Sequence, residues 1–237
     1  MKRTLLLLII AICLYSCNKN ESPNLIVKKW VAVGNSITWH PINNNWAGEW
    51  GMAATSIEND YVHILNQNFK NNFDSVSFKI DWAVDWETNH PNYDLSYFDK
   101  FFDGDEDLVV IRLGENVKDT TNFEADFRHL IQHLKHLSPN AKFVITGIFM
   151  SDSNDLKYKE TIQKKIAKSE NCIWVPINQL DTKENRNFIG NTVNGRTIEN
   201  QAVADHPGDK GMEAIAEVIF ESLQKKGKSI LTLSAIR

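Results

Sequence analysis

The sequence predicts an α/β fold in which parallel strands are connected by helices. Short apolar runs rich in β-branched and aromatic residues alternate along the chain with longer amphipathic stretches, as is typical of βαβ units around a parallel sheet. The chain has 237 residues, of which 42% are hydrophobic, and this fits one domain with a substantial core better than two domains.

Five runs are predicted to be strands: Trp30–Val33, Val76–Asp81, Asp107–Arg112, Lys142–Thr146 and Cys172–Pro176. Between them, apolar residues at helical spacing predict helices at Ile57–Phe69, Phe123–Leu137 and Leu156–Ser169. The last helix is expected at about Lys210–Gln224, with Asp209 placed to cap its start.

Two stretches, Trp39–Met52 and Gln179–Val203, are polar and irregular. Ligands of open parallel sheets bind beyond the carboxyl ends of the strands, so these loops are where a substrate is expected.

The first residues have the layout of a secretory signal. Lys2 and Arg3 precede an apolar run, Leu5–Leu14, which is too short to cross a bilayer as a stable helix. The following Leu14–Cys17 segment resembles a bacterial lipobox, which implies that Cys17 is the lipidated first residue of the mature protein. The alternative is an ordinary signal peptide with an incidental cysteine.

We therefore expect a signal peptide at 1–16, a lipidated polar tether at 17–27, the α/β domain at 28–225 and a C-terminal tail at 226–237. The protein would be a membrane-anchored lipoprotein of the bacterial envelope, outside the cytoplasm. Losing Lys2 and Arg3 changes the net charge from −4 to −6, which does not suggest a nucleic-acid surface. Cys13 would be removed with the signal peptide and Cys17 would carry the lipid, which leaves Cys172. No disulfide framework is therefore expected.

A candidate nucleophile follows the first predicted strand. Ser36, within the segment Gly34–Thr38, lies where a strand turns toward the first helix, and a side chain there is exposed at the sheet edge. Thr38 occupies the place of the second glycine of a Gly-x-Ser-x-Gly elbow, and the segment lacks the end of a phosphate-binding loop. A structural alternative is a turn in which Ser36 caps a helix.

The segment Gly34-Asn35-Ser36-Ile37-Thr38 resembles the first block of the SGNH (GDSL-like) hydrolase family, with Asn35 in place of the commoner aspartate. This resemblance implies a flavodoxin-like three-layer α/β/α fold with a five-stranded parallel sheet. It also implies serine esterase chemistry that needs neither a metal nor an organic cofactor.

Two further segments match blocks of the same family. Gly114-Glu115-Asn116 follows the third predicted strand, and its match implies that Asn116 donates to the oxyanion. His206-Pro207 stands directly before the last predicted helix, and its match implies that His206 is the general base for Ser36. The alternative for all three segments is an inactive domain of the same fold.

The family's usual aspartate, three residues before the histidine, is Val203 here. Asp205 is the nearest acid, but adjacent residues of extended chain point to opposite sides, so its contact with the ring is doubtful. The alternatives are a backbone carbonyl or an acid of the preceding loop, and we expect a Ser–His dyad. The acids are Asp181, Glu184 and Glu199.

The family also commonly supplies a glycine N–H to the oxyanion hole, and Trp86 occupies that position. The backbone N–H of Trp86 could still donate, and the alternative donor is the N–H of Gly51. A bulky residue at this position would narrow the site toward small acyl groups.

Tryptophans are concentrated in two loop segments near the expected site. Trp39, Trp46 and Trp50 lie in one segment, and Trp82 and Trp86 lie in the other. An indole offers a flat apolar face and one donor, a surface suited to sugar rings, so the first three are predicted to bind substrate. Core packing is the alternative for each of them.

Three histidines, His129, His133 and His136, share helical spacing on one predicted helix. Leu130 stands where a zinc-protease helix has glutamate, so we interpret this as a solvated helix face and expect no metal.

Together these features predict a serine esterase that hydrolyses a small acyl ester, acetyl above all, on a carbohydrate. The expected partners are that ester substrate and a lipid membrane. Two alternatives stay open: a glycan-binding lipoprotein without catalysis, and a hydrolase of lipid esters.

Overall fold

Five parallel strands form the central sheet of this computed structural model, in the order β2-β1-β3-β4-β5. Their bounds are β1 (Lys29–Gly34), β2 (Ser77–Trp82), β3 (Leu108–Arg112), β4 (Lys142–Thr146) and β5 (Ile173–Val175). This is the flavodoxin-like strand order, in which ligands bind beyond the carboxyl ends of the strands. Each predicted strand is confirmed to within one residue at both ends.

The structure describes residues 26–150 and 153–234. The predicted signal peptide and the lipidation site at Cys17 therefore lie outside the described residues. Among the helices of the described ranges, none is both long enough and apolar enough to cross a membrane.

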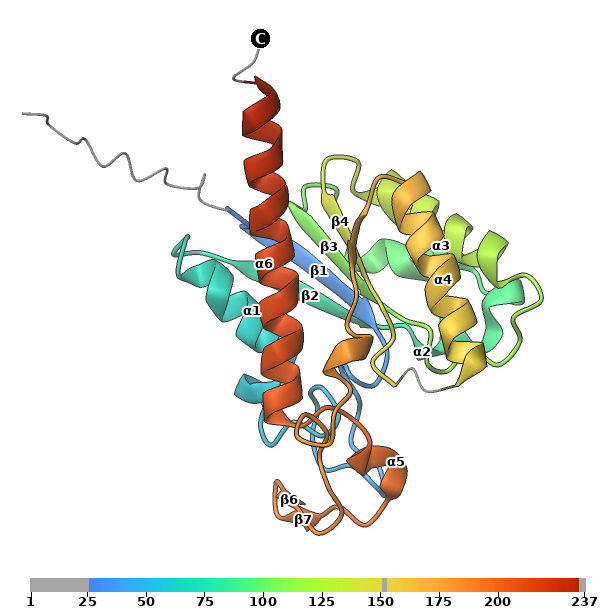
Figure 1. The fold of residues 1–237 in the computed structure, drawn as a ribbon, viewed down its shortest axis with the longest axis vertical. Helices are drawn as coiled ribbons and strands as arrows, with labels where there is room; N and C mark the ends of the chain where they lie inside the picture. Colours follow the sequence, from blue (N-terminus) through green and yellow to red (C-terminus); the bar gives the residue numbers. More distant parts are fainter. Residues whose placement is uncertain (1–25, 151–152, 235–237) are drawn as a thin grey trace, which may run out of the picture.

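Helices cover both faces of the sheet and complete a three-layer α/β/α arrangement (Figure 1). The helices α1 (Tyr61–Lys70) and α6 (Asp209–Ser234) pack on one face, and α2 (Val84–Asn89), α3 (Phe123–Leu137) and α4 (Asn154–Ser169) pack on the other. Alternate residues of the central strands point to opposite faces. Ala32 and Val110 join the core under α1 and α6, whereas Val33 and Ile111 join the core under α3 and α4.

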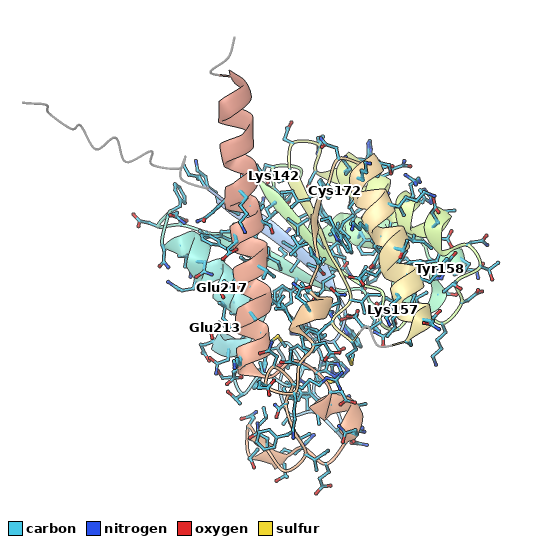
Figure 2. The ribbon with its side chains drawn as sticks, viewed as in Figure 1. Lys142, Lys157, Tyr158, Cys172, Glu213 and Glu217 are labelled. Carbon is cyan, nitrogen blue, oxygen red and sulfur yellow. The ribbon has the colours of Figure 1, made fainter. Side chains whose placement is uncertain are left out.

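The long helices bury one side and expose the other. Figure 2 labels Glu213 and Glu217 on α6, and Lys157 and Tyr158 on α4, and all four residues are exposed. This amphipathic pattern is the signal by which the sequence predicts these helices.

Three helices differ from their predicted bounds, and of these α4 differs only by beginning two residues earlier, at Asn154. The predicted Ile57–Phe69 helix is divided into a 3₁₀ turn (Ile57–Asn59) and α1, because the carboxylate of Asp60 accepts a hydrogen bond from His63 N and caps α1. The last helix continues to Ser234, through most of the stretch expected as a tail.

Of the two stretches expected to be irregular, Trp39–Met52 contains no helix or strand, and Gln179–Val203 contains short elements. The strands β6 (Thr192–Val193) and β7 (Arg196–Thr197) form a hairpin, and α5 (Gln201–Ala204) follows it. A small separate core joins these elements to the loop after β1. Its buried members are Trp46, Met52, Ala53, Val193, Ile198, Val203 and Ala204. The two loops that carry the predicted site are therefore packed against each other.

Candidate active site

Ser36 lies on a tight turn immediately beyond the carboxyl end of β1. The backbone N–H groups of Thr38 and Trp39 both donate to the carbonyl of Asn35, at 2.9 and 3.0 Å. Gly34 allows this turn, because a Cβ at that position would lie 1.9 Å from Thr38 Oγ1. The turn leaves the Ser36 side chain partly exposed at the edge of the sheet.

His206 comes to the same place from the other end of the chain. It lies between α5 and α6, and its carbonyl accepts a hydrogen bond of 2.9 Å from Asn187 N. The side chain of Asn187 is buried and donates to the carbonyl of Ala53 at 2.5 Å. Asn187 thus ties the histidine loop to the loop that follows the nucleophile.

The two side chains form a hydrogen-bonded pair. Ser36 Oγ lies 2.8 Å from His206 Nε2, and His206 Nδ1 lies 2.6 Å from the carbonyl oxygen of Ala202. A carbonyl oxygen only accepts, so the proton of the neutral ring is on Nδ1. Nε2 therefore presents a lone pair to which the Ser36 hydroxyl donates, and this is the arrangement that a general base requires.

The Ala202 carbonyl is available because it belongs to the last turn of α5. The N–H of Asp205 donates to Gln201 O and that of His206 donates to Val203 O, at 2.9 and 3.1 Å. Carbonyls at the end of a helix have no partner within the helix, and this one accepts from the imidazole instead. A backbone carbonyl thus occupies the place of a triad acid.

Asp205, the acid predicted nearest to the ring, contacts other groups. Its carboxylate accepts from Arg186 at 3.1 Å and from Gln201 at 2.9 Å. Neighbouring side chains point in different directions, which explains why His206 is buried while Asp205 is only partly so. Asp181, an alternative acid of the preceding loop, pairs with Arg186 as well.

Burial controls the protonation of His206. The pKa of His206 is lowered from 6.5 to about 4, mainly by burial and in smaller part by the guanidinium of Arg112, and the hydrogen bond to Ala202 opposes this shift. The imidazole is therefore neutral at pH 7 and ready to accept a proton.

The third predicted segment follows β3. Asn116 lies beyond the carboxyl end of that strand, and its side-chain amide donates to Glu87 Oε2 at 2.6 Å. Gly114, with φ of +130°, donates its backbone N–H to the other oxygen of Glu87. The Gly114–Asn116 loop is thus attached to α2 through one carboxylate.

A buried polar cluster extends behind Ser36 and Asn116. Asn35 donates from Nδ2 to Glu87 at 3.1 Å and to Glu115 at 2.8 Å, and its Oδ1 accepts from Arg112 at 2.5 Å. Arg112 also pairs with Glu115, and its side chain is completely buried. Burial and the nearby charge of Glu115 raise the pKa of Glu87, and the hydrogen bonds from Asn116, Gly114 and Asn35 oppose this rise.

The other predicted oxyanion donors have different surroundings. The N–H of Gly51 donates to the buried carboxylate of Asp60 at 3.2 Å, so it already has an acceptor. Trp86 lies in the first turn of α2, where N–H groups have no acceptor within the helix. Its indole is buried and packs against Phe123 and Phe127. The oxyanion roles of Trp86 and Gly51 stay predictions.

The three tryptophans predicted to bind substrate separate into two groups. Trp46 is buried, with its ring 5.7 Å from that of Trp50, and Trp50 donates to the carbonyl of Ala54 at 2.9 Å. Packing accounts for these two residues. Trp39 is partly exposed on the nucleophile loop and lies edge-on to Trp82, with ring centroids 6.0 Å apart. Trp39 is thus the best placed of the three to meet a substrate.

The histidines on α3 do not converge on one another. His129 and His136 are exposed, and His133 pairs with Asp99 at 2.9 Å. Among the described residues, the acidic groups that come within ligand distance of one another are Asp103, Asp105 and Glu106. Lys29 lies 2.7 and 2.5 Å from the carboxylates of Asp103 and Asp105, and Lys29 therefore already supplies a counter-charge there.

Sequence reasoning did not identify Glu87 or Asn187 as parts of this site. Glu87 stands in a polar stretch without a recognisable pattern, and Asn187 lies in a loop rich in asparagine. Their roles depend on which distant backbone groups they reach. A single signal was visible: Arg112 interrupts an otherwise apolar strand, and a buried charge needs a polar partner.

No protein-family model matches the sequence, and a comparison with curated proteins finds no match. Solved structures do resemble this one. A variant of Axe2, an acetyl xylan esterase from Geobacillus stearothermophilus, has a TM-score of 0.55 at 15% identity, covering 83% of this chain and 94% of its own. The acetyl xylan esterase AlAXEase has a TM-score of 0.55 at 17% identity, covering 82% and 98%.

A two-domain esterase active on acetylated mannans has a TM-score of 0.57 at 16% identity, covering 84% of this chain and 48% of its own. At these identities the similarity establishes the fold. The chain therefore shares its three-layer α/β/α fold with esterases, several of which are described as acting on acetylated polysaccharides.

Proposed function

We propose that this chain is a serine esterase of the SGNH type that removes a small acyl group, acetyl above all, from a carbohydrate. The observation that carries the proposal is the Ser36–His206 hydrogen bond of 2.8 Å, with the proton of the neutral imidazole held on the opposite nitrogen by Ala202. The esterase neighbours support the same reaction class, and those acting on acetylated glycans support the substrate class.

The reaction follows from this geometry. Ser36 Oγ attacks the ester carbonyl carbon while its proton passes to His206 Nε2, and the carbonyl oxygen becomes an oxyanion. His206 then protonates the alcohol oxygen, the carbon–oxygen bond to the alcohol breaks, and the acyl group stays on Ser36. Water attacks this acyl-enzyme, with His206 again accepting the proton, and the released acid restores Ser36.

Asn116 is the proposed side-chain donor to the oxyanion. One of its two amide hydrogens is used by Glu87, which leaves the other for the substrate oxygen. The main-chain N–H of Trp86 is a second proposed donor, on the strength of its position in the first turn of α2.

A Ser–His dyad can work with a backbone carbonyl in the place of the triad acid. The main tasks of that acid are to select the ring tautomer and to orient the ring, and the Ala202 carbonyl can do both. The acid's negative charge is what the dyad lacks.

The test is hydrolysis of 4-nitrophenyl acetate and of an acetylated xylo- or manno-oligosaccharide by the purified chain. Ser36→Ala and His206→Ala should each lower kcat/KM at least about 1,000-fold, because nucleophile and base act as one unit. Matched controls are Ser77→Ala, at the opposite end of β2, and His136→Ala, on the exposed side of α3; both should keep full activity.

Glycan binding without turnover, unchanged in Ser36→Ala, would instead identify a binding protein. Turnover of long-chain lipid esters in preference to the acetylated oligosaccharide would identify a lipid-ester hydrolase.

We also propose that the enzyme is anchored to a membrane of the bacterial envelope, outside the cytoplasm, through a lipid on Cys17. This proposal is based on the lipobox-like segment alone.

A further inference from the structure

The strongest feature outside the Ser–His pair is the carboxylate of Glu87. It lies in α2, is 1% exposed, and accepts hydrogen bonds from the loops after two different strands. Asn35 donates to it from the loop after β1, and Gly114 and Asn116 donate to it from the loop after β3. The turn that carries Ser36 and the Gly114–Asn116 loop thus both contact this one side chain.

We propose that Glu87 is a positioning residue that orients the amide of Asn116, so that its second N–H points at the oxyanion formed when Ser36 attacks. The inference rests on the proposed esterase function and deepens it, because it assigns the group that organises the oxyanion hole.

The argument begins with the chemistry of a primary amide. Asn116 Nδ2 carries two hydrogens in a fixed plane, so a hydrogen bond made by one of them also sets the direction of the other. The bond from Nδ2 to Glu87 Oε2 is 2.6 Å and has an anionic acceptor when Glu87 is ionised, and such bonds are short and strong. Without it, the amide could rotate away from the reacting carbonyl.

The backbone of the same loop is held by the same carboxylate. Gly114 N donates to Glu87 Oε1, and the loop follows a path with φ of +130° at Gly114 that residues with a side chain rarely adopt. Fixing both the loop backbone and the amide with one buried group is the kind of support that keeps a catalytic donor within a fraction of an ångström.

The cluster also accounts for Asn35, the residue that departs from the commoner aspartate of SGNH hydrolases. Its Nδ2 lies within hydrogen-bond distance of both Glu87 and Glu115. An aspartate at this position would remove these donors and place a third carboxylate beside two others, with Arg112 as their near cation. Asn35 and Glu87 are therefore chemically matched.

The test is the Glu87→Gln variant of the full chain, assayed with 4-nitrophenyl acetate. Glutamine keeps the shape of the side chain, but it replaces one acceptor oxygen with a donor that faces other donors. We expect kcat to fall about 10- to 100-fold and KM to change less than about threefold. The loss of kcat should not exceed the loss that follows removal of an oxyanion donor itself.

A double-mutant cycle separates positioning from a general structural role. In an Asn116→Ala background, Glu87→Gln should lower kcat by no more than about twofold further, because the group that it positions is already gone. Losses that multiply would overturn the inference, and so would an unchanged kcat in Glu87→Gln.

Glu106→Gln is the matched control, because it makes the same change to another buried carboxylate. Glu106 is also buried and accepts from two backbone N–H groups, Asp103 N at 2.7 Å and Gly104 N at 3.1 Å, and it lies before the amino end of β3, whereas the candidate site lies beyond the carboxyl ends of the strands. We expect this variant to lose thermal stability but to keep its kcat at temperatures where it is folded.

If Glu87→Gln does not fold, Glu87→Asp gives a second measurement, since it keeps the charge and withdraws the carboxylate by one methylene. It should also lose kcat, and full activity in this variant would contradict the inference. Wild-type hydrolysis that disappears in Ser36→Ala shows that the esterase proposal holds whatever the Glu87 variants do.

Discussion

At the scale of single residues, the structure brings a hydroxyl and an imidazole together although 170 positions separate them in the chain. The imidazole of His206 is buried, is oriented by a backbone carbonyl, and lies near the positive charge of Arg112. Each of these features affects when it can act as a base.

Catalysis should depend on pH through the protonation of His206. The lowered pKa of His206, about 4 instead of 6.5, means that the base stays neutral in mildly acidic solution. As pH falls, protonation of His206 should lower kcat/KM with a midpoint near 4, because only the neutral ring accepts the serine proton.

Acetate release measured from pH 3.5 to 8 at constant ionic strength checks this midpoint, with circular dichroism at each pH to confirm that the chain is folded. An acid limb centred at 6.5 or above would show that the ring is more solvated or more stabilised as a cation than this geometry implies.

At the scale of elements, the site depends on how the long helix α6 is joined to the loop after β1. Asp209, at the start of α6, accepts hydrogen bonds from Thr55 N at 2.7 Å, Thr55 Oγ1 at 2.6 Å and Asn59 Nδ2 at 3.1 Å. The sequence predicts that Asp209 caps this helix; in the structure Asp209 is the first residue of α6, and its carboxylate binds a segment about 150 positions away in the chain.

We expect Asp209→Ala to lower the free energy of unfolding by about 1–3 kcal/mol, because three donors lose a partly buried acceptor. Glu213→Ala, in the next turn of α6 and exposed, is the control and should change it by less than about 0.5 kcal/mol. Urea unfolding curves with matched slopes give both values. Equal effects in the two variants would mean that this connection contributes little to stability.

At the scale of the whole molecule, buried titratable groups make stability depend on pH in two opposing directions. The lowered pKa of His206 destabilises the folded chain as pH falls from 6.5 toward 4, since the unfolded state then binds a proton that the folded state does not. Asp81 acts in the opposite sense, because burial raises its pKa from 3.8 to about 7.

Asp81 is 1% exposed, and its Oδ2 has no hydrogen-bond partner among the described residues. The folded chain binds the proton of Asp81 more tightly than the unfolded chain does, so protonation of Asp81 stabilises the folded state. This stabilisation is complete below pH 3.8 and is lost as the pH rises to about 7. The Asp81→Asn side chain does not titrate, so this loss should be absent from the variant. Its free energy of unfolding at pH 8, relative to that at pH 4, should be higher than in wild type by up to about 4 kcal/mol.

Chemical denaturation at pH 4, 6 and 8 measures this effect, and Asp85→Asn, on the exposed side of α2, serves as the control. If the free energies of unfolding of wild type and Asp81→Asn change with pH in parallel, Asp81 is ionised in the folded state.

The fold could be predicted from local patterns because its elements are long or strongly apolar. Most of the strands are largely apolar runs, and in β2 apolar residues alternate with polar ones. The helix α3 was predicted with its observed bounds because apolar residues recur along it at helical spacing. By contrast, α2, α5 and the β6–β7 hairpin have at most six residues each, and elements of this size form where tertiary contacts hold them.

Local sequence was thus enough to predict parallel strands connected by helices and to mark Ser36, Asn116 and His206 as residues at chain turns near the sheet edge, and the resemblance to a known hydrolase family implied the three-layer arrangement. Tertiary structure alone selected the Ala202 carbonyl as the partner of His206, directed Asp205 toward Arg186, and brought Glu87 under Asn116. The physical reason is range: periodicity and turn chemistry act over a few residues, whereas a buried polar group takes its partners from whatever distant backbone the packed core places within 3 Å of it.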